Sequence, residues 1–250
     1  MTEFSIVIPA YNEESRIIST LTQTINFMNS FSDAFEIIVV DDGSSDSTVD
    51  IVSKYAKERS NIKLIQNSHK GKGYAVRTGV LNALGEYILL SDADMATPIE
   101  ELKRLHVWMK DSDFDVVIAS REGVGARRNK EPFIRHLMGR IFNMMIRLLL
   151  VPEIQDTQCG FKLFKKKAAY DIFRRLVLYG ENAKELKHPR VTAFDVEVLF
   201  VARKLNYRIK EVPVTWTYDA GTKVNKIRDS IVNFIDILTI KVNSLQGKYN

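Results

Sequence analysis

Residues 88–98 read ILLSDADMATP, and the fold assignment starts from this stretch. The apolar run 87–90 is typical of a short strand buried in a parallel sheet. Two carboxylates, Asp92 and Asp94, follow it with one residue between them. Because neighbouring negative charges repel each other, we expect a metal ion, a lysine or arginine, or water to lie between them.

The first half of the chain repeats this pattern of an apolar run followed by an amphipathic stretch. The repeat predicts an α/β fold, a doubly wound and mostly parallel sheet with helices on both faces. Ligands of such sheets bind at the carboxyl ends of the strands, so the residues there are candidate site residues. The predicted strands are 4–8, 35–40, 62–65, 87–90 and 116–119, and the predicted helices are 13–29, 47–59, 74–84 and 98–110.

Three of these strand ends are acidic and one carries an arginine: PAYNEES (9–15), DDGSSDST (41–48), SDADMATP (91–98) and SREG (120–123). No GxGxxG motif follows the first strand, and the chain has no GxxxxGK[ST] motif. The glycines of KGKGYAVRTG (70–79) match neither spacing. The sequence therefore excludes the dinucleotide-binding and P-loop classes.

Helix capping does not account for the acids at 92 and 94. Residues 97–100, TPIE, predict a capping box with proline at the first helical position, so the next helix has its own cap. Asp46 and Ser47 are assigned to capping the helix after the second strand.

The pair Asp92 and Asp94 predicts a site for Mg²⁺ or Mn²⁺. Alternate residues of an extended segment point the same way, so both carboxylates can reach one ion. Hard divalent cations prefer oxygen ligands, and substrate phosphates commonly complete their shell. The chain has no cluster of histidines and cysteines, which disfavours zinc. The expected further ligand is a diphosphate, which the metal would neutralise as a leaving group.

Composition indicates an ordinary globular protein with an uneven charge. The 250 residues are 45% hydrophobic and 27% charged, with a net charge of +5 and a single cysteine, Cys159. The first residues enter a strand directly, so we expect a cytoplasmic chain. Between Arg121 and Arg175 there are 13 Lys or Arg against 5 Asp or Glu. Such a zone attracts nucleic acid, anionic lipid or a phosphorylated molecule, unless it is only a solvated face.

Residues 133–151, FIRHLMGRIFNMMIRLLLV, predict a largely apolar helix. On a helix His136, Arg140, Asn143 and Arg147 form one narrow polar stripe. Two interior arginines argue against a bilayer span, since each costs about 2.5–3.5 kcal/mol at the helix centre. The helix is therefore either a core helix or one that lies in the membrane interface.

Basic residues precede this helix, and a second amphipathic segment follows at the C-terminus. Arg127, Arg128 and Lys130 would meet anionic head groups. Arginines here alternate with Ile, Leu and Met rather than with exposed aromatics, so we expect a lipid partner and no nucleic acid. In the C-terminal segment, core packing is as plausible as membrane contact. Its apolar stripe is Ile227, Ile231, Phe234, Ile235, Leu238, Val242 and Leu245.

The motifs in register resemble family 2 glycosyltransferases of the GT-A fold. They are IPAYNEE, VVDDGSSDST, KGKGYAVRTG, DAD, ASR, DTQCGFKLF, FDVEVLF and EVPVTWTYDAGTK, and they cover nearly all of the chain. More narrowly, the chain is similar to the polyprenyl- and dolichyl-phosphate sugar synthases. Ala96 and Thr217 depart from the mannose-synthase pattern, so the glucosyltransferase branch is favoured. The resemblance implies a GT-A domain over 1–223, with 133–151 as a candidate membrane-interface helix, and a C-terminal amphipathic helix and tail over 224–250.

The resemblance also implies site residues. Asp92 and Asp94 would hold the metal, and Asp94, Arg121 and Asp195 would be catalytic. Arg121 and Arg135 would bind the acceptor phosphate, whereas Asp156 would touch the sugar or cap its loop. The donor-binding residues would be Pro9, Tyr11, Glu13, Val40, Asp42, Ala93, Asp94 and Lys223.

The implied reaction is inverting transfer of a hexose, glucose from UDP-glucose, to a polyprenyl or dolichyl phosphate. A phosphate acceptor is already anionic and needs positioning rather than a general base. The enzyme would sit peripherally on the cytoplasmic face of a membrane. Two alternatives stay open: GDP-mannose as the donor, or a hydroxyl acceptor with Asp195 as the base.

Overall fold

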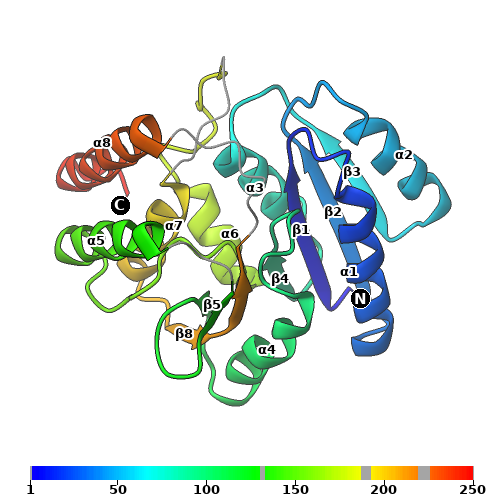
Figure 1. Cartoon of the computed structure of the whole chain (residues 1–250), viewed down its shortest axis with the longest axis horizontal. Coiled ribbons are helices and arrows are strands. Elements are labelled where there is room, and N and C mark those ends of the chain that lie inside the picture. The colour runs from blue at the N-terminus through cyan, green and yellow to red at the C-terminus, as the bar shows by residue number, and fades with distance from the viewer. Residues whose placement is uncertain (1, 130–132, 187–192, 219–225, 250) are drawn as a thin grey trace.

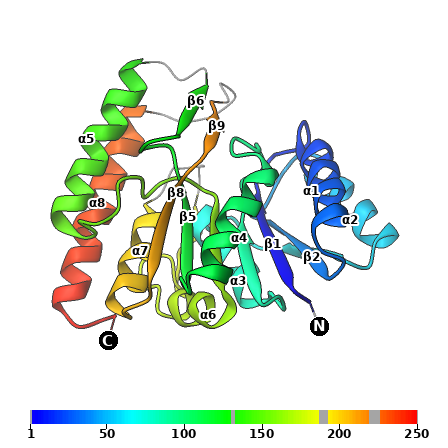
Figure 2. The same cartoon turned by 90° about the horizontal axis from the view of Figure 1, so that it is seen from below.

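The computed structural model describes residues 2–129, 133–186, 193–218 and 226–249, and a seven-stranded sheet lies at its centre. The strand order is β3-β2-β1-β4-β7-β5-β8 (Figures 1 and 2). Of the paired strands described, β7 alone is antiparallel to its neighbours, β4 and β5. The strands are β1 (Phe4–Ala10), β2 (Phe35–Asp41), β3 (Ile62–Gln66), β4 (Tyr87–Leu90), β5 (Val116–Ser120), β7 (Lys162–Lys165) and β8 (Ile209–Pro213).

Helices cover both faces of this sheet, as the alternating pattern predicts. Successive strand residues point to opposite faces, so Ile6 and Ile8 enter one core cluster and Val7 the other. The first cluster lies under α1 (Ile17–Phe31), α2 (Thr48–Glu58) and α4 (Leu102–Asp111). The second lies under α3 (Lys72–Leu81), α6 (Lys166–Arg174) and α7 (Phe194–Lys204). The predicted doubly wound α/β fold is confirmed.

All five predicted strands are present, but two details of capping are wrong. The chain enters α4 through a short 3-10 helix (Ile99–Glu101) without a side-chain cap, and the Thr97 hydroxyl lies 3.7 Å from Cys159 Sγ instead. Before α2, the carboxylate of Asp46 accepts the N–H of Thr48 at 3.0 Å, as predicted, whereas Ser47 makes no cap hydrogen bond. The capping box fails because the Thr97 hydroxyl turns toward the neighbouring loop.

The helices α5 (Phe133–Leu149) and α8 (Lys226–Leu245) lie side by side at the edge of the molecule away from α1 and α2 (Figures 1 and 2). Both send apolar side chains into the core cluster under α7: Ile146 and Leu150 from α5 and its end, and Ile237 and Ile240 from α8. Among the described residues, no helix combines the length and apolar character needed to cross a bilayer. A short parallel pair of strands, β6 (Arg127–Asn129) and β9 (Thr215–Thr217), lies near the carboxyl end of β5.

Candidate active site

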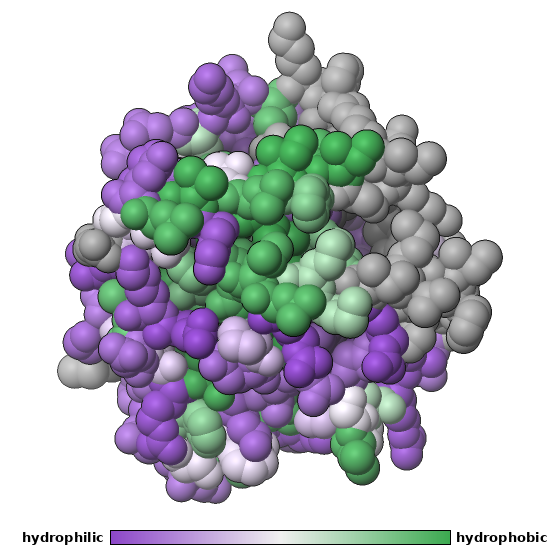
Figure 3. Space-filling view, turned by 90° about the vertical axis from the view of Figure 1, so that its left-hand side faces the viewer, coloured by the Kyte–Doolittle hydropathy of each residue, from purple (hydrophilic) through white to green (hydrophobic). Residues whose placement is uncertain are grey.

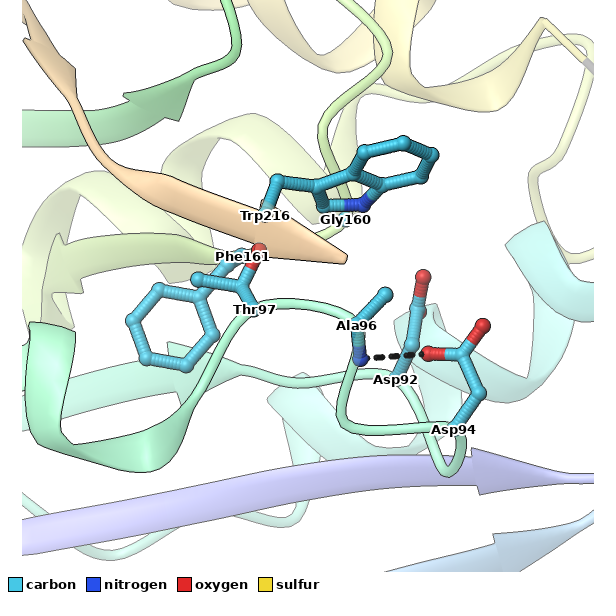
Figure 4. Close-up of a pocket in the computed structure, with 7 residues that line it drawn as sticks. All are labelled: Asp92, Asp94, Ala96, Thr97, Gly160, Phe161 and Trp216. Atoms are coloured by element: carbon cyan, nitrogen blue, oxygen red, sulfur yellow. Dashed lines mark hydrogen bonds between the residues drawn. The ribbon is translucent and has the colours of Figure 1, made fainter. Parts of the chain in front are cut away.

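The loop after β4 holds the two aspartates in a turn rather than in the predicted extended segment. The N–H of Met95 donates to the carbonyl of Asp92 at 3.2 Å, and Met95 has φ 50°. The carboxylate of Asp94 accepts the N–H of Ala96 at 3.0 Å. This turn, not strand alternation, brings both carboxylates to the same side of the loop (Figure 4).

A small pocket of about 20 Å³ opens at these carboxylates (Figure 4). Its volume suits a single ion or water rather than a sugar. The pocket needs a glycine at position 160, because a Cβ there would stand only 2.2 Å from Asp92 Oδ2 and would displace this carboxylate. The pocket is lined by Asp92, Asp94, Ala96, Thr97, Gly160, Phe161 and Trp216.

A lysine supplies the positive charge that the aspartate pair requires. The ammonium group of Lys72 lies 2.6 Å from Asp92 Oδ1. Burial acts to lower the pKa of Lys72, but the surrounding carboxylates, Asp92 and Asp195 foremost, outweigh it and raise that pKa. Burial also raises the pKa of Asp94, and the negative charge of Asp92 adds to the effect. Of the three alternatives that the sequence left open, a metal ion, a basic side chain or water, the structure places a basic side chain beside Asp92.

Lys72 is a site residue that the sequence reasoning missed. It lies in the stretch KGKGYAVRTG, whose spacing excluded two nucleotide-binding motifs but gave no hint of an ion pair. The signal that could have found it is the need for a cation beside Asp92 and Asp94. Two lysines and one arginine in that stretch were candidates, and only the fold selects among them.

The start of α3, and with it Lys72, is held by the predicted donor-site residue Asp42. Its buried carboxylate accepts the backbone N–H groups of Lys70 at 2.9 Å and Gly71 at 2.9 Å, and it lies 2.8 Å from His69 Nδ1. Burial raises the pKa of Asp42, although these hydrogen bonds oppose the effect. Asp42 therefore fixes the loop that carries Lys72.

The other predicted donor-site residues line the same edge or lie beneath it. The rings of Tyr11 and His69 stack at 4.3 Å, and Glu13 pairs with Arg16 at 2.8 Å. Pro9 is half-buried at the end of β1. The side chain of Val40 is buried under α3, so it faces the core.

Of the two remaining predicted donor-site residues, Ala93 is described by the structure and Lys223 is not. The carbonyl of Ala93 accepts the hydroxyl of Thr20 at 2.6 Å, which anchors the aspartate turn to α1. Lys223 lies outside the described residues.

Asp195 belongs to the same cluster of charges, but it is already paired. Its carboxylate accepts a hydrogen bond from the buried ammonium group of Lys162, which also donates to the carbonyl of Cys159. Asp195 lies in the first turn of α7, and its charge helps to raise the pKa of Lys72. Charges of alternating sign therefore run from the pocket into the core, in the order Asp92, Lys72, Asp195 and Lys162.

Arg121 forms an ion pair with Asp156, which is fully buried. Arg121 donates from Nε and Nη2 to the two carboxylate oxygens, each at 2.8 Å, and its backbone N–H donates at 2.8 Å as well. Burial would raise the pKa of Asp156, but the Arg121 charge and its hydrogen bonds lower that pKa to about 2. Asp156 thus positions Arg121.

Arg121 also lies next to the aspartate pocket. Its guanidinium group stands 5.3 Å from the ring centre of Trp216, a pocket residue. Arg135, the other predicted phosphate ligand, lies on α5, and its side chain is outside what the structure describes.

Comparisons with known proteins show the family of this chain. The profile of glycosyl transferase family 2 matches residues 5–173. The chain belongs to glycosyl transferase family 2. The dolichyl-phosphate beta-glucosyltransferase of Dictyostelium discoideum is 38% identical over 97% of this chain and 75% of its own length. Its namesake from Mus musculus is 34% identical over 99% of this chain and 77% of its own length.

Solved structures show that the fold is GT-A. Glucosyl-3-phosphoglycerate synthase from Mycobacterium tuberculosis, in complex with UDP, has a TM-score of 0.66 and 16% identity, covering 96% of this chain and 80% of that one. The mannosyltransferase PcManGT from Pyrobaculum calidifontis, in complex with GDP-Man and Mn²⁺, has a TM-score of 0.63 and 20% identity, covering 95% and 64%.

Proposed function

We propose that this protein transfers glucose from UDP-glucose to a polyprenyl or dolichyl phosphate, with inversion at the sugar. The observation that carries the proposal is the likeness to the dolichyl-phosphate beta-glucosyltransferases, up to 38% identity over 97% of the chain. The site supports it because it joins a two-carboxylate pocket to an arginine that a buried aspartate orients.

Asp92 and Asp94 would hold Mg²⁺ or Mn²⁺, and the donor set fits such an ion. Both ligands are carboxylates, which suit these hard cations. Among the described residues no group of three His, Cys, Asp or Glu could hold a metal, so the other ligands would have to come from the substrate or water. A donor diphosphate would complete the shell, as is usual for these ions. When bound, the metal would neutralise the charge that develops on the departing nucleoside diphosphate.

The state of Asp195 favours a phosphate acceptor over a hydroxyl acceptor. A hydroxyl nucleophile needs a base to take its proton, but the Asp195 carboxylate already accepts a hydrogen bond from Lys162. A phosphate monoester attacks as an anion and needs only to be held in line. We assign this holding role to Arg121, whose planar guanidinium group suits phosphate oxygens.

The surface of α8 supports a membrane-bound acceptor. The described residues of its apolar stripe, from Ile231 to Leu245, are exposed, whereas Asn233, Asp236 and Asn243 are buried. Met144 and Leu148 of α5 are exposed as well, and Figure 3 shows a broad, mostly green area on this side of the molecule. The described exposed residues of this apolar face are Met144, Leu148, Ile231, Phe234, Ile235, Leu238, Val242 and Leu245. We propose that this face rests on the cytoplasmic surface of a membrane.

The buried and exposed residues of α5 differ in part from those that the sequence predicted. The side of α5 that faces the core lies next to its predicted polar stripe, since Ile146, three residues from Asn143, is fully buried. Asn143, a member of the stripe, is buried as well and accepts the hydroxyl of Thr157 at 3.2 Å. Arg140 and Arg147 are exposed and would meet anionic head groups.

The basic residues before α5 were predicted to meet head groups too. Arg128 is instead paired with Glu122 at 2.7 Å and donates to the carbonyl of Arg121 at 2.8 Å. It therefore supports the Arg121 segment. Arg127 is exposed, and Lys130 lies outside the described residues.

The test is transfer of labelled sugar into an organic-extractable product. Purified protein would receive vesicles with polyprenyl phosphate, labelled UDP-glucose or GDP-mannose, and Mn²⁺ or EDTA. We expect metal-dependent label from UDP-glucose, and none with Asp94→Asn. The exposed loop variant Asp33→Asn is the matched control and should keep full activity.

Other outcomes would overturn parts of the proposal. Label from GDP-mannose alone would correct the donor. If an oligosaccharide with free hydroxyls replaced the lipid as acceptor, and a folded Asp195→Asn variant lost that activity, the hydroxyl-acceptor alternative would hold.

A further inference from the structure

Lys72 occupies a place that a divalent cation would also need. Its ammonium group contacts Asp92 Oδ1, and Asp92 is one of two carboxylates at the pocket. The Asp92 carboxylate packs closely against Gly160, which leaves room for it: a Cβ there would stand 2.2 Å from Oδ2 and 2.8 Å from Oδ1. A metal ion bound between Asp92 and Asp94 therefore has to compete with Lys72.

The backbone of Lys72 is fixed, so the contact is not a chance surface pair. Lys72 is the first residue of α3, and the preceding Gly71 has φ 93°. The N–H of Gly71 donates to the buried carboxylate of Asp42 at 2.9 Å. A left-handed glycine and a buried acceptor together set the direction in which the lysine leaves the helix.

A second carboxylate acts on Lys72, because the negative charge of Asp195 helps to raise the pKa of the lysine. Its ammonium group lies 5.5 Å from the ring centre of Phe194, the residue before Asp195. Four flexible carbons let the ammonium group swing between carboxylates without moving the backbone.

We propose that Lys72 is a built-in competitor for the metal: it neutralises Asp92 in the metal-free protein, and it turns toward Asp195 when a divalent cation takes its place. The inference rests on the metal dependence proposed above. Its consequence is that Lys72 stabilises the two adjacent carboxylates before the metal arrives, and thereby weakens metal binding. Lys72 is a positioning residue in this account.

The test is direct titration of the metal-free protein with Mn²⁺, followed by electron paramagnetic resonance of the free ion. Lys72→Met should bind Mn²⁺ roughly two- to fivefold more tightly than the wild type, the range expected for a partly exposed ion pair. Lys72→Arg keeps the charge and should stay near the wild-type affinity. Lys70→Met is the matched control, because Lys70 lies in the same loop but its ammonium group stands 4.5 Å from the ring centre of Tyr74; it should leave the affinity unchanged.

Thermal unfolding gives a second readout on the same proteins. In EDTA, Lys72→Met should melt at a lower temperature than the wild type, since two neighbouring carboxylates lose their cation. Added Mn²⁺ should then raise the melting temperature of Lys72→Met by more than that of the wild type, because tighter binding stabilises more.

The outcomes separate this inference from the proposed function. Wild-type binding of Mn²⁺ with an unchanged or weaker affinity in Lys72→Met would overturn the role of Lys72 alone. An equal gain in Mn²⁺ affinity in Lys70→Met would mean that only the net charge of the protein matters, and it would also overturn the role of Lys72. No Mn²⁺ binding in either the wild type or Lys72→Met would overturn both the competition and the proposed metal dependence.

Discussion

The guanidinium group of Arg121 grips the carboxylate of Asp156 through two parallel hydrogen bonds, Nε to Oδ2 and Nη2 to Oδ1, each 2.8 Å long. The carboxylate is fully buried, and a third bond from the backbone N–H of Arg121 holds it at 2.8 Å. Only 16% of the Arg121 side chain is exposed, so Asp156 decides where its charge points.

Removing the Asp156 charge should therefore damage both stability and activity. Asp156→Asn breaks a buried pair, and we expect it to lower the free energy of unfolding by about 3 kcal/mol. Arg121→Lys keeps the positive charge but loses the planar guanidinium group that holds two oxygens at once. We expect it to lower kcat strongly and to lower the free energy of unfolding only slightly. Urea unfolding and lipid-glucosylation assays measure the two effects. The exposed Arg127→Lys is the control; equal activity in both lysine variants would contradict a holding role for Arg121.

The pH dependence of stability should report the same pair. The pKa of Asp156 is lowered to about 2 in the folded protein, so the unfolded chain binds its proton first as the pH falls. The stabilisation is complete above about pH 4 and is lost as the pH falls through about 2. The difference in unfolding free energy between wild type and Asp156→Asn should thus shrink by about 2 kcal/mol between pH 5 and pH 2. A constant difference across this range would show that the pair does not carry the effect.

Gly160 should be needed for the metal site and much less for the fold. A methyl group there would stand 2.2 Å from Asp92 Oδ2, so Gly160→Ala must push the Asp92 carboxylate out of the pocket. We expect glucosyl transfer to fall at least about tenfold, as misplacement of a catalytic group by 1 Å can cost more. Circular dichroism should show a folded protein. Full activity in Gly160→Ala would mean that Asp92 need not keep the position seen here.

The sequence indicated the sheet and the aspartate pair because both signals are local. Each predicted strand is a mostly apolar run with at most one polar residue, and Asp92 and Asp94 are two residues apart. β7 gave no such signal, because its first residue, Lys162, reads as a surface residue. Lys162 can be buried only because Asp195, 33 positions away, meets its charge.

Other contacts depend on the fold in the same way. Glu197, completely buried, accepts the N–H groups of Val177, Leu178 and Tyr179 and the hydroxyl of Tyr249, which stands 52 residues further along the chain. Burial raises the pKa of Glu197. Neither hydrophobic periodicity nor motif spacing contains this information. For the same reason the ion pair between Lys72 and Asp92 could be anticipated only as a need for some cation.

The exposed stripe of α8 offers the sharpest test of the membrane-facing surface. Ile235 is 54% exposed and lies in the middle of the stripe, so a charge there should leave the fold intact but oppose insertion among lipid head groups. Ile235→Asp should bind vesicles of anionic lipid several-fold more weakly than the wild type in co-sedimentation, with no change in melting temperature. Val107→Asp is the matched control, since Val107 is 55% exposed on α4, which lies away from α8 (Figure 2). Equal binding by the two variants would mean that the apolar face of α8 does not contact the membrane, and a second protein chain would then be the better candidate to cover it.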